Sequence, residues 1–109
     1  ERKAHSIRRP TVPVNCGHNA HMYYLLVQDV NARSMFIENM KMSGVNCVFH
    51  YVPLHNSIAG KRLARFHGPM TVTNSLSERL VRLPLWPGLE EDSLQDDVIS
   101  SCLSILNNR

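Results

Sequence analysis

The sequence lacks the features that mark several classes of protein. No apolar run approaches the roughly 18 to 20 residues that a membrane-spanning helix requires, and no signal peptide is recognisable. Glycine is scarce, with 5 in 109 residues, and none builds a phosphate-binding loop. No nucleophile elbow is present, and the acidic residues 90–92 and 96–97 suit a helix start better than acid-base chemistry. We therefore expect a cytoplasmic protein without a membrane contact.

Cysteine is also scarce and irregularly spaced. The three cysteines, Cys16, Cys47 and Cys102, share no CxxC spacing, which indicates isolated thiols in a reducing compartment. Cys16 with His18 and His21 could offer three metal ligands. A structural zinc site needs a second ligand pair, however, and the sequence has none at comparable spacing, so we expect no metal.

The positive charge lies at one end of the chain. Lys and Arg number 12 against 9 Asp and Glu, and the excess falls in the first ten residues, at Arg2, Lys3, Arg8 and Arg9. Such a tail could contact nucleic acid or anionic lipid. No aromatic residues are interleaved with the charges, so we expect a solvated, flexible tail over residues 1–12 and no nucleic-acid partner. Residues 13–109 are then one small domain, because a chain this short buries one modest core.

Periodicity predicts two strands around a helix. Residues 21–28 are apolar on both faces of an extended chain, which is typical of an interior strand. A second strand is expected over 45–52 and completes a β-α-β unit. The pattern does not show whether these two strands are direct neighbours.

The helix between these strands is expected to begin after a cap at Asn31 and to end at Gly44. Phe36 and Ile37 both reach Met40 on its buried face, while its solvent side carries three charged residues, Arg33, Glu38 and Lys41.

The rest of the sequence, from residue 56 onward, predicts a loop and two further helices. Residues 56–73 have no apolar period and indicate a long loop with at most one helical turn. Ser75 and Glu78 have the spacing of a capping box, which predicts a helix that buries Leu76, Leu80 and Leu83 before Pro84 ends it. A last helix is expected over 93–106, with a buried stripe of Leu94, Val98, Cys102 and Ile105.

The candidate site lies at residues 50–55, which read HYVPLH. Pro53 cannot donate a ladder hydrogen bond, so the strand should end near Val52 and leave His55 on the connection. An imidazole can donate or accept a hydrogen bond near neutral pH, which makes His50, Tyr51 and His55 the candidate site residues. In the alternative interpretation, His50 and Tyr51 alternate across a half-buried strand and are satisfied by backbone groups.

Three ordered motifs carry a family resemblance. They are NAHMYY at 19–24, HYVPLH at 50–55 and SERLVRLPL at 77–85, and together they resemble the C-terminal part of the DegT/DnrJ/EryC1/StrS family of pyridoxal-phosphate (PLP) sugar aminotransferases. The resemblance covers residues 11–107. It implies an α/β (α+β) fold, the small C-terminal domain of fold-type I aminotransferases. That domain has a three- to four-stranded sheet, mixed or antiparallel, packed with helices.

The resemblance also implies a function. Family members are several times longer, and their Schiff-base lysine lies in a large domain that this chain lacks. None of Lys3, Lys41 and Lys61 stands in a comparable motif, so we expect a fragment that binds no PLP covalently and is inactive alone.

By motif position, His50 matches the family histidine that faces the cofactor and the nucleotide-sugar substrate, with Tyr51 and His55 close behind. A role in surface polysaccharide or lipopolysaccharide biosynthesis and a homo-oligomer follow from the same resemblance. The alternative is a standalone, non-catalytic binding or interaction module derived from that domain.

Overall fold

The computed structural model describes residues 7–107, apart from the side chain of Asp92. In chain order it contains the elements β1 (Tyr23–Leu26), α1 (Val30–Met42), β2 (Val48–Phe49), α2 (Ile58–Leu63), α3 (Thr71–Arg79), β3 (Leu80–Leu83) and α4 (Leu94–Asn107). Two short 3₁₀ turns, η1 (Leu54–Asn56) and η2 (Glu91–Ser93), precede α2 and α4.

The three strands form one antiparallel sheet in the order β1-β3-β2. Val81, in the central strand β3, stands opposite Leu25 on one side and Phe49 on the other. This sheet with its helices confirms the predicted fold class. The interior position predicted for residues 21–28 is wrong, because β1 stands at the end of the strand order, and among the described residues its outer side pairs only at Leu26, with Arg8.

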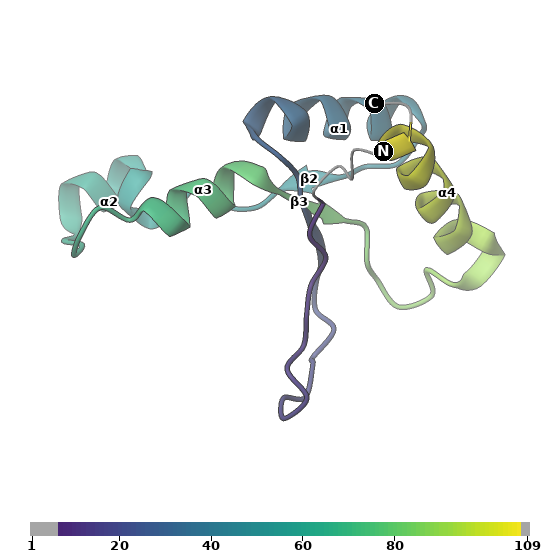
Figure 1. The fold of residues 1–109 in the computed structure, drawn as a ribbon, viewed down its shortest axis with the longest axis horizontal. Helices are drawn as coiled ribbons and strands as arrows, with labels where there is room; N and C mark the ends of the chain where they lie inside the picture. The colour runs from purple at the N-terminus through teal and green to yellow at the C-terminus, as the bar shows by residue number, and fades with distance from the viewer. Residues whose placement is uncertain (1–6, 108–109) are drawn as a thin grey trace, which may run out of the picture.

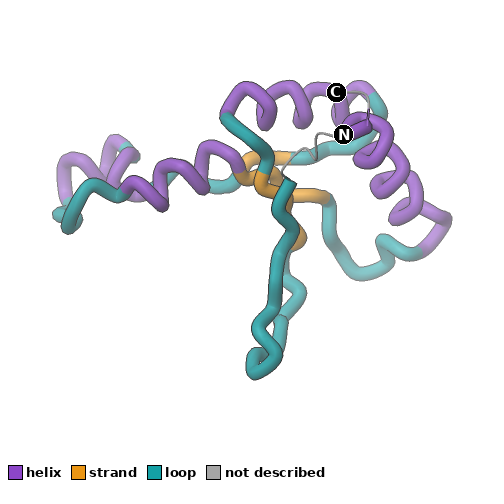
Figure 2. Tube along the Cα trace, viewed as in Figure 1, coloured by secondary structure: helices purple, strands orange, loops and turns teal. Residues whose placement is uncertain are grey.

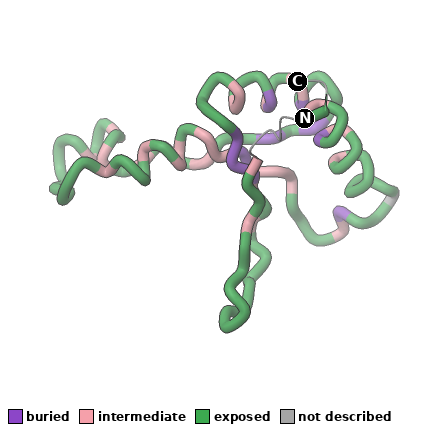
Figure 3. Tube along the Cα trace, in the orientation of Figure 1, coloured by how far each residue is buried: buried purple, intermediate pink, exposed green. Residues whose placement is uncertain are grey.

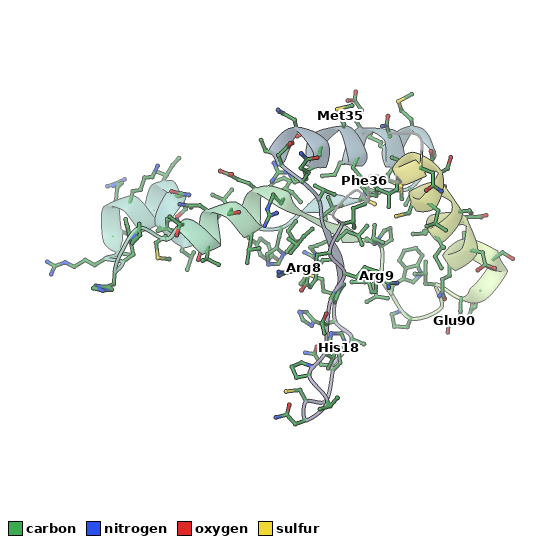
Figure 4. All side chains as sticks on the ribbon, viewed as in Figure 1. Arg8, Arg9, His18, Met35, Phe36 and Glu90 are labelled. Carbon is green, nitrogen blue, oxygen red and sulfur yellow. The ribbon has the colours of Figure 1, made fainter. Side chains whose placement is uncertain are left out.

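The core lies between the sheet and the two helices α1 and α4. Phe36 and Met40 of α1 are both 0 % exposed and pack with Leu25 and Val81 of the sheet and Cys102 of α4. Figure 4 shows Phe36 on the side of α1 that faces the sheet and Met35 on the opposite side. The predicted buried face of this helix is therefore confirmed.

The ends of α1 follow from side-chain and backbone chemistry. Its N-cap is Asp29, whose carboxylate accepts a hydrogen bond from the Ala32 amide at 2.8 Å, so the prediction of Asn31 as the cap was two residues late. Gly44 follows the last turn at φ +81°, a left-handed conformation that favours glycine. The predicted glycine stop is confirmed.

The stretch from Thr71 to Leu83 departs most from expectation. α3 begins at Thr71, so Ser75 lies inside the helix and is not its N-cap. Residues 80–83 form β3, although the spacing of Leu76, Leu80 and Leu83 predicted a helix. The same residues also fit an extended chain, and pairing with strands on both sides satisfies their backbone groups.

Two other expected boundaries are also corrected. β2 is two residues long, and the expected strand over 45–52 is therefore mostly irregular. The expected long loop contains α2, whose first turn is capped by the Ser57 hydroxyl accepting from the Gly60 amide at 2.9 Å. The last helix is confirmed, with Cys102 buried, but Leu94 at its start is exposed.

Two segments extend away from the sheet (Figures 1 and 2). Residues 8–22, the loop arm, run out and back around a turn in which the Cys16 amide donates to the Pro13 carbonyl. Residues 58–79, the helical arm, contain α2 and α3. The radius of gyration of 16.1 Å exceeds the value of about 13 Å for a compact domain of this length, and Figure 3 shows both arms largely exposed.

The described part of the N-terminal segment contacts the domain. Ile7 packs against the core, and Arg8 and Leu26 exchange two backbone hydrogen bonds of 3.0 and 2.9 Å. Residues 1–6 of the expected tail lie outside the described residues, so the boundary at residue 12 stays a prediction.

The buried thiols predict a loss of stability in alkali. Burial, reinforced by the neighbouring Cys102, raises the pKa of Cys47 to about 11. An unfolded chain binds that proton less tightly, with a pKa of about 8.5. As pH rises through this window the unfolded state ionises first, so stability present below pH about 8.5 is lost towards pH 11, by on the order of 1 to 3 kcal/mol. Denaturant unfolding at pH 8 and pH 10.5 should show this loss, and Cys47→Ala should reduce it; an unchanged pH dependence would contradict the assignment.

Gly60 is predicted to be essential for packing η1 on the helical arm. A Cβ at this position would overlap the backbone carbonyl of Leu54, which cannot move without displacing the whole turn. Gly60→Ala should therefore cost about 1 to 3 kcal/mol and accelerate amide exchange in α2. Gly17→Ala is the matched control, because nothing lies within 4 Å of its added methyl group. Equal behaviour of the two variants in denaturant titrations and exchange would show that the overlap is relieved at no cost.

Candidate functional site

His50 lies directly after β2, on the irregular segment that leads to Pro53. Its side chain is half-buried, and its Nδ1 atom is buried with no hydrogen-bond partner among the described residues. In the alternative interpretation, backbone groups would form hydrogen bonds with the histidine, but no described backbone group bonds to this nitrogen. A buried polar atom without a partner costs about 1 to 3 kcal/mol, so a ligand or another protein segment that supplies one would be favoured.

Tyr51 is the exposed neighbour of His50. Its side chain is 74 % exposed, and the two rings lie 4.8 Å apart between centroids with their planes at 55°. The phenol therefore stands at the surface beside the half-buried imidazole. Together these side chains offer a hydrogen-bonding and stacking surface on residues that no ladder hydrogen bond constrains.

His55 contacts the helical arm. It lies on η1, and its Nε2 is 2.7 Å from the Oδ1 atom of Asn74 in α3. The same oxygen accepts a hydrogen bond from Asn56 Nδ2 at 2.8 Å. An amide oxygen only accepts, so His55 Nε2 carries the proton. The ring also contacts Phe66 at 5.5 Å between centroids, and His55 therefore ties η1 to the arm.

Arg33 is a residue of this region that the sequence analysis misplaced. It was expected on the solvent side of α1, but it is half-buried. Its Nη1 donates to the Ser77 carbonyl at 3.1 Å, and its guanidinium carbon lies 5.4 Å from the centroid of the Phe49 ring. Its position three residues before Phe36 could have indicated this, because residues at that spacing share a helix face.

The described residues form a hollow of about 590 Å³ elsewhere on the domain. The turn between α1 and β2, the strand β3, the connection after it and α4 line this hollow, and Arg82 and Asp97 are its charged members. None of the three candidate site residues lines it. The candidate segment, residues 50–55, is thus separate from this hollow.

The other groups considered from the sequence lie apart from this segment. His18, on the loop arm in Figure 4, accepts a hydrogen bond from the Ala20 amide through Nδ1, and His21 Nδ1 lies 2.7 Å from Asn19 Oδ1. Within residues 7–107 no three His, Cys, Asp or Glu side chains are arranged to hold a metal ion. The helices of this part of the chain include none with the length and apolarity of a bilayer span.

The fold recurs in solved aminotransferase structures. The aminotransferase TlmJ from Streptoalloteichus hindustanus is similar with a TM-score of 0.78 and 24 % identity, over 94 % of this chain and 26 % of that one. A DegT DnrJ EryC1 StrS aminotransferase from Brucella abortus gives 0.75 and 25 %, over 90 % and 26 %. A candidate sugar aminotransferase from Streptococcus pneumoniae, Spr1654 in its PLP form, gives 0.66 and 18 %, over 93 % and 26 %.

Sequence similarity leads to the same group. The uncharacterized protein MJ1066 of Methanocaldococcus jannaschii is 28 % identical over 105 residues, which are 92 % of this chain and 27 % of that protein. The chain thus spans about a quarter of the length of the relatives that it matches. The sequence pattern of the DegT/DnrJ/EryC1/StrS aminotransferase family matches residues 2–102, and the chain therefore belongs to this family.

Proposed function

We propose that this chain is the C-terminal domain of a PLP-dependent nucleotide-sugar aminotransferase, and that it supplies contacts on the substrate side of the active site. Membership of the family supports the reaction class, and the similarity to a candidate sugar aminotransferase supports a sugar substrate. The three motifs resemble those of dTDP-4-amino-4,6-dideoxygalactose transaminase. A dTDP-linked amino sugar destined for surface polysaccharide or lipopolysaccharide is therefore the proposed substrate.

One observation carries this proposal. His50, at the motif position of the family histidine, holds a buried Nδ1 atom without a partner in the described structure. A sugar hydroxyl or amine could complete that hydrogen bond and would be oriented by it. Tyr51, exposed beside it, would then contact the same ligand.

The residues described do not form a complete PLP site. Bound PLP stabilises a carbanion, and the enzyme holds it through a lysine. Lys41 and Lys61 are both exposed, and within the described residues no hydrogen bond or ion pair joins either side chain to the candidate segment. We therefore assign the lysine and the phosphate donors to the remaining three-quarters of a family-length protein.

A second candidate function is a non-catalytic interaction module. The observation that favours it is the set of exposed apolar side chains on the helical arm, Ile58, Leu63, Phe66 and Val72. Exposed apolar patches of this kind mark surfaces that another protein segment covers. In the first proposal the large domain covers them, and in the second a separate partner does.

His50→Ala tests the first proposal in two proteins. In this chain it should lower the free energy of unfolding by no more than about 0.5 kcal/mol, because no partner of Nδ1 is left unpaired. Asn74→Ala is the comparison, since it removes the shared acceptor of His55 and Asn56 and should cost about 0.5 to 1.5 kcal/mol for each hydrogen bond lost. In a full-length nucleotide-sugar aminotransferase of this family that carries the HYVPLH motif, the same change at the first histidine of the motif should raise KM for the nucleotide sugar at least about tenfold.

Two controls separate an effect on substrate binding from an effect on cofactor binding. PLP absorbance of that full-length enzyme should stay unchanged in the variant, and this chain treated with PLP and borohydride should give no stoichiometric lysine adduct. A large loss of stability in His50→Ala with an unaltered KM would remove His50 as a site residue. A stoichiometric adduct on Lys41 or Lys61 would overturn the assignment of the lysine to another part of the protein.

The exposed apolar surface predicts self-association of the chain when it is produced alone. Sedimentation at tens of micromolar should show dimers or larger species, because water-exposed apolar area favours association. Replacing Ile58 and Leu63, which are 82 % and 84 % exposed, with serine should weaken it. Val14→Ser on the loop arm, fully exposed, is the matched control. A monomer at all concentrations would show that this surface needs no cover.

A further inference from the structure

We propose that Arg33 is a positioning residue for the candidate segment, holding residues 50–55 and the helical arm in one fixed arrangement. The proposal rests on the proposed function for its purpose, since it treats this segment as the part that meets the substrate. This arrangement, which we call the Arg33 clamp, rests only on contacts within the described residues. It joins four elements of the chain: α1, β2, η1 and α3.

The first end of the segment is held through Phe49. This residue directly precedes His50, and the Arg33 guanidinium lies over its ring at 5.4 Å from the centroid. A cation over an aromatic face is attracted by the negative potential of that face. Because Phe49 is also paired with Val81 of the central strand, the backbone entering His50 is fixed from two sides.

The same guanidinium reaches the last turn of α3. Arg33 Nη1 donates to the Ser77 carbonyl at 3.1 Å, across 44 residues of sequence. The four last carbonyls of a helix lack partners within it, so this bond satisfies one of them and fixes the end of the helical arm against α1. One side chain thus contacts both the start of the candidate segment and the base of the arm.

The second end of the segment is held by α3 itself. Asn74, one turn before Ser77, accepts hydrogen bonds from His55 and Asn56 through its Oδ1 atom at 2.7 and 2.8 Å. The contacts therefore close a ring that runs from Arg33 through Ser77, Asn74 and His55, and back along residues 55–49 to Arg33. His50 and Tyr51 belong to the stretch of chain that closes this ring of contacts, and they make no ladder hydrogen bond of their own.

The contacts made by residue 33 require an arginine side chain. A planar guanidinium can lie flat on an aromatic ring while an N–H at its edge points to a carbonyl, whereas an ammonium is a compact charge without that fixed geometry. The Nε atom is also buried, and it has no partner among the described residues, although the residue as a whole is half-buried. Release of Arg33 should loosen both ends of the candidate segment together.

Amide hydrogen exchange of this chain tests the clamp. In Arg33→Met, amides of residues 54–57 and 74–80 should exchange at least about tenfold faster, while those of Leu25 and Val81 in the sheet should change less than about twofold. Arg33→Lys should recover only part of the protection. Lys41→Met, which removes an exposed cation from the same helix, should leave the pattern unaltered.

A second variant, Phe49→Leu, tests the clamp even if Arg33→Met does not fold. Phe49→Leu removes the ring beneath the guanidinium and leaves every donor of Arg33 in place. It should accelerate the same amides by a smaller factor and abolish the ring-current shift of the Arg33 Cδ protons.

Faster exchange of arm and sheet amides by the same factor would overturn the proposal, because Arg33 would then only support the core. Unaltered exchange in both variants would overturn it as well. These readouts need no ligand, so failure of His50 to influence nucleotide-sugar KM would remove the proposed function and leave the clamp standing.

Discussion

The pairing of β3 with strands on both sides is the constraint on which the rest of this structure depends. β3 follows α3 without a linker, so the direction of the strand sets the direction of the helical arm. Its central residue Val81 is fully buried between Leu25 and Phe49 of the flanking strands. The sheet therefore places the arm and the candidate segment at the same end of the domain, although they come from different parts of the chain.

The contacts at this end are polar, whereas those in the core are apolar. Phe36 and Met40 hold α1 to the sheet by burial, which is strong and has little directional preference. Arg33 and Asn74 add hydrogen bonds between α1, α3 and η1, which are weaker but fix geometry. A segment that must present an imidazole to a ligand needs the second kind of contact in addition to the first.

The two arms give the domain an open shape, and the chain spans about a quarter of the length of its relatives. Further protein could cover such exposed surfaces. The exposed apolar residues of the helical arm form one of them, and His50, whose Nδ1 atom has no partner among the described residues, lies at another. In our proposal, the first meets protein and the second meets the nucleotide sugar.

The sequence by itself determined the local structure and the family. The spacing of Phe36 and Met40, the stop at Gly44 and the last helix were predicted because neighbours along the chain decide them, and the HYVPLH motif located the candidate site. Only the tertiary structure decided that residues 80–83 form the central strand and that Arg33 lies inside. The leucine spacing there allows a helix, and strand partners some 30 to 60 residues away override it. Whether a cation on α1 faces water likewise depends on whether Phe49 and Ser77 lie beside it. The spacing of Arg33 from Phe36 allows the buried face but does not decide it.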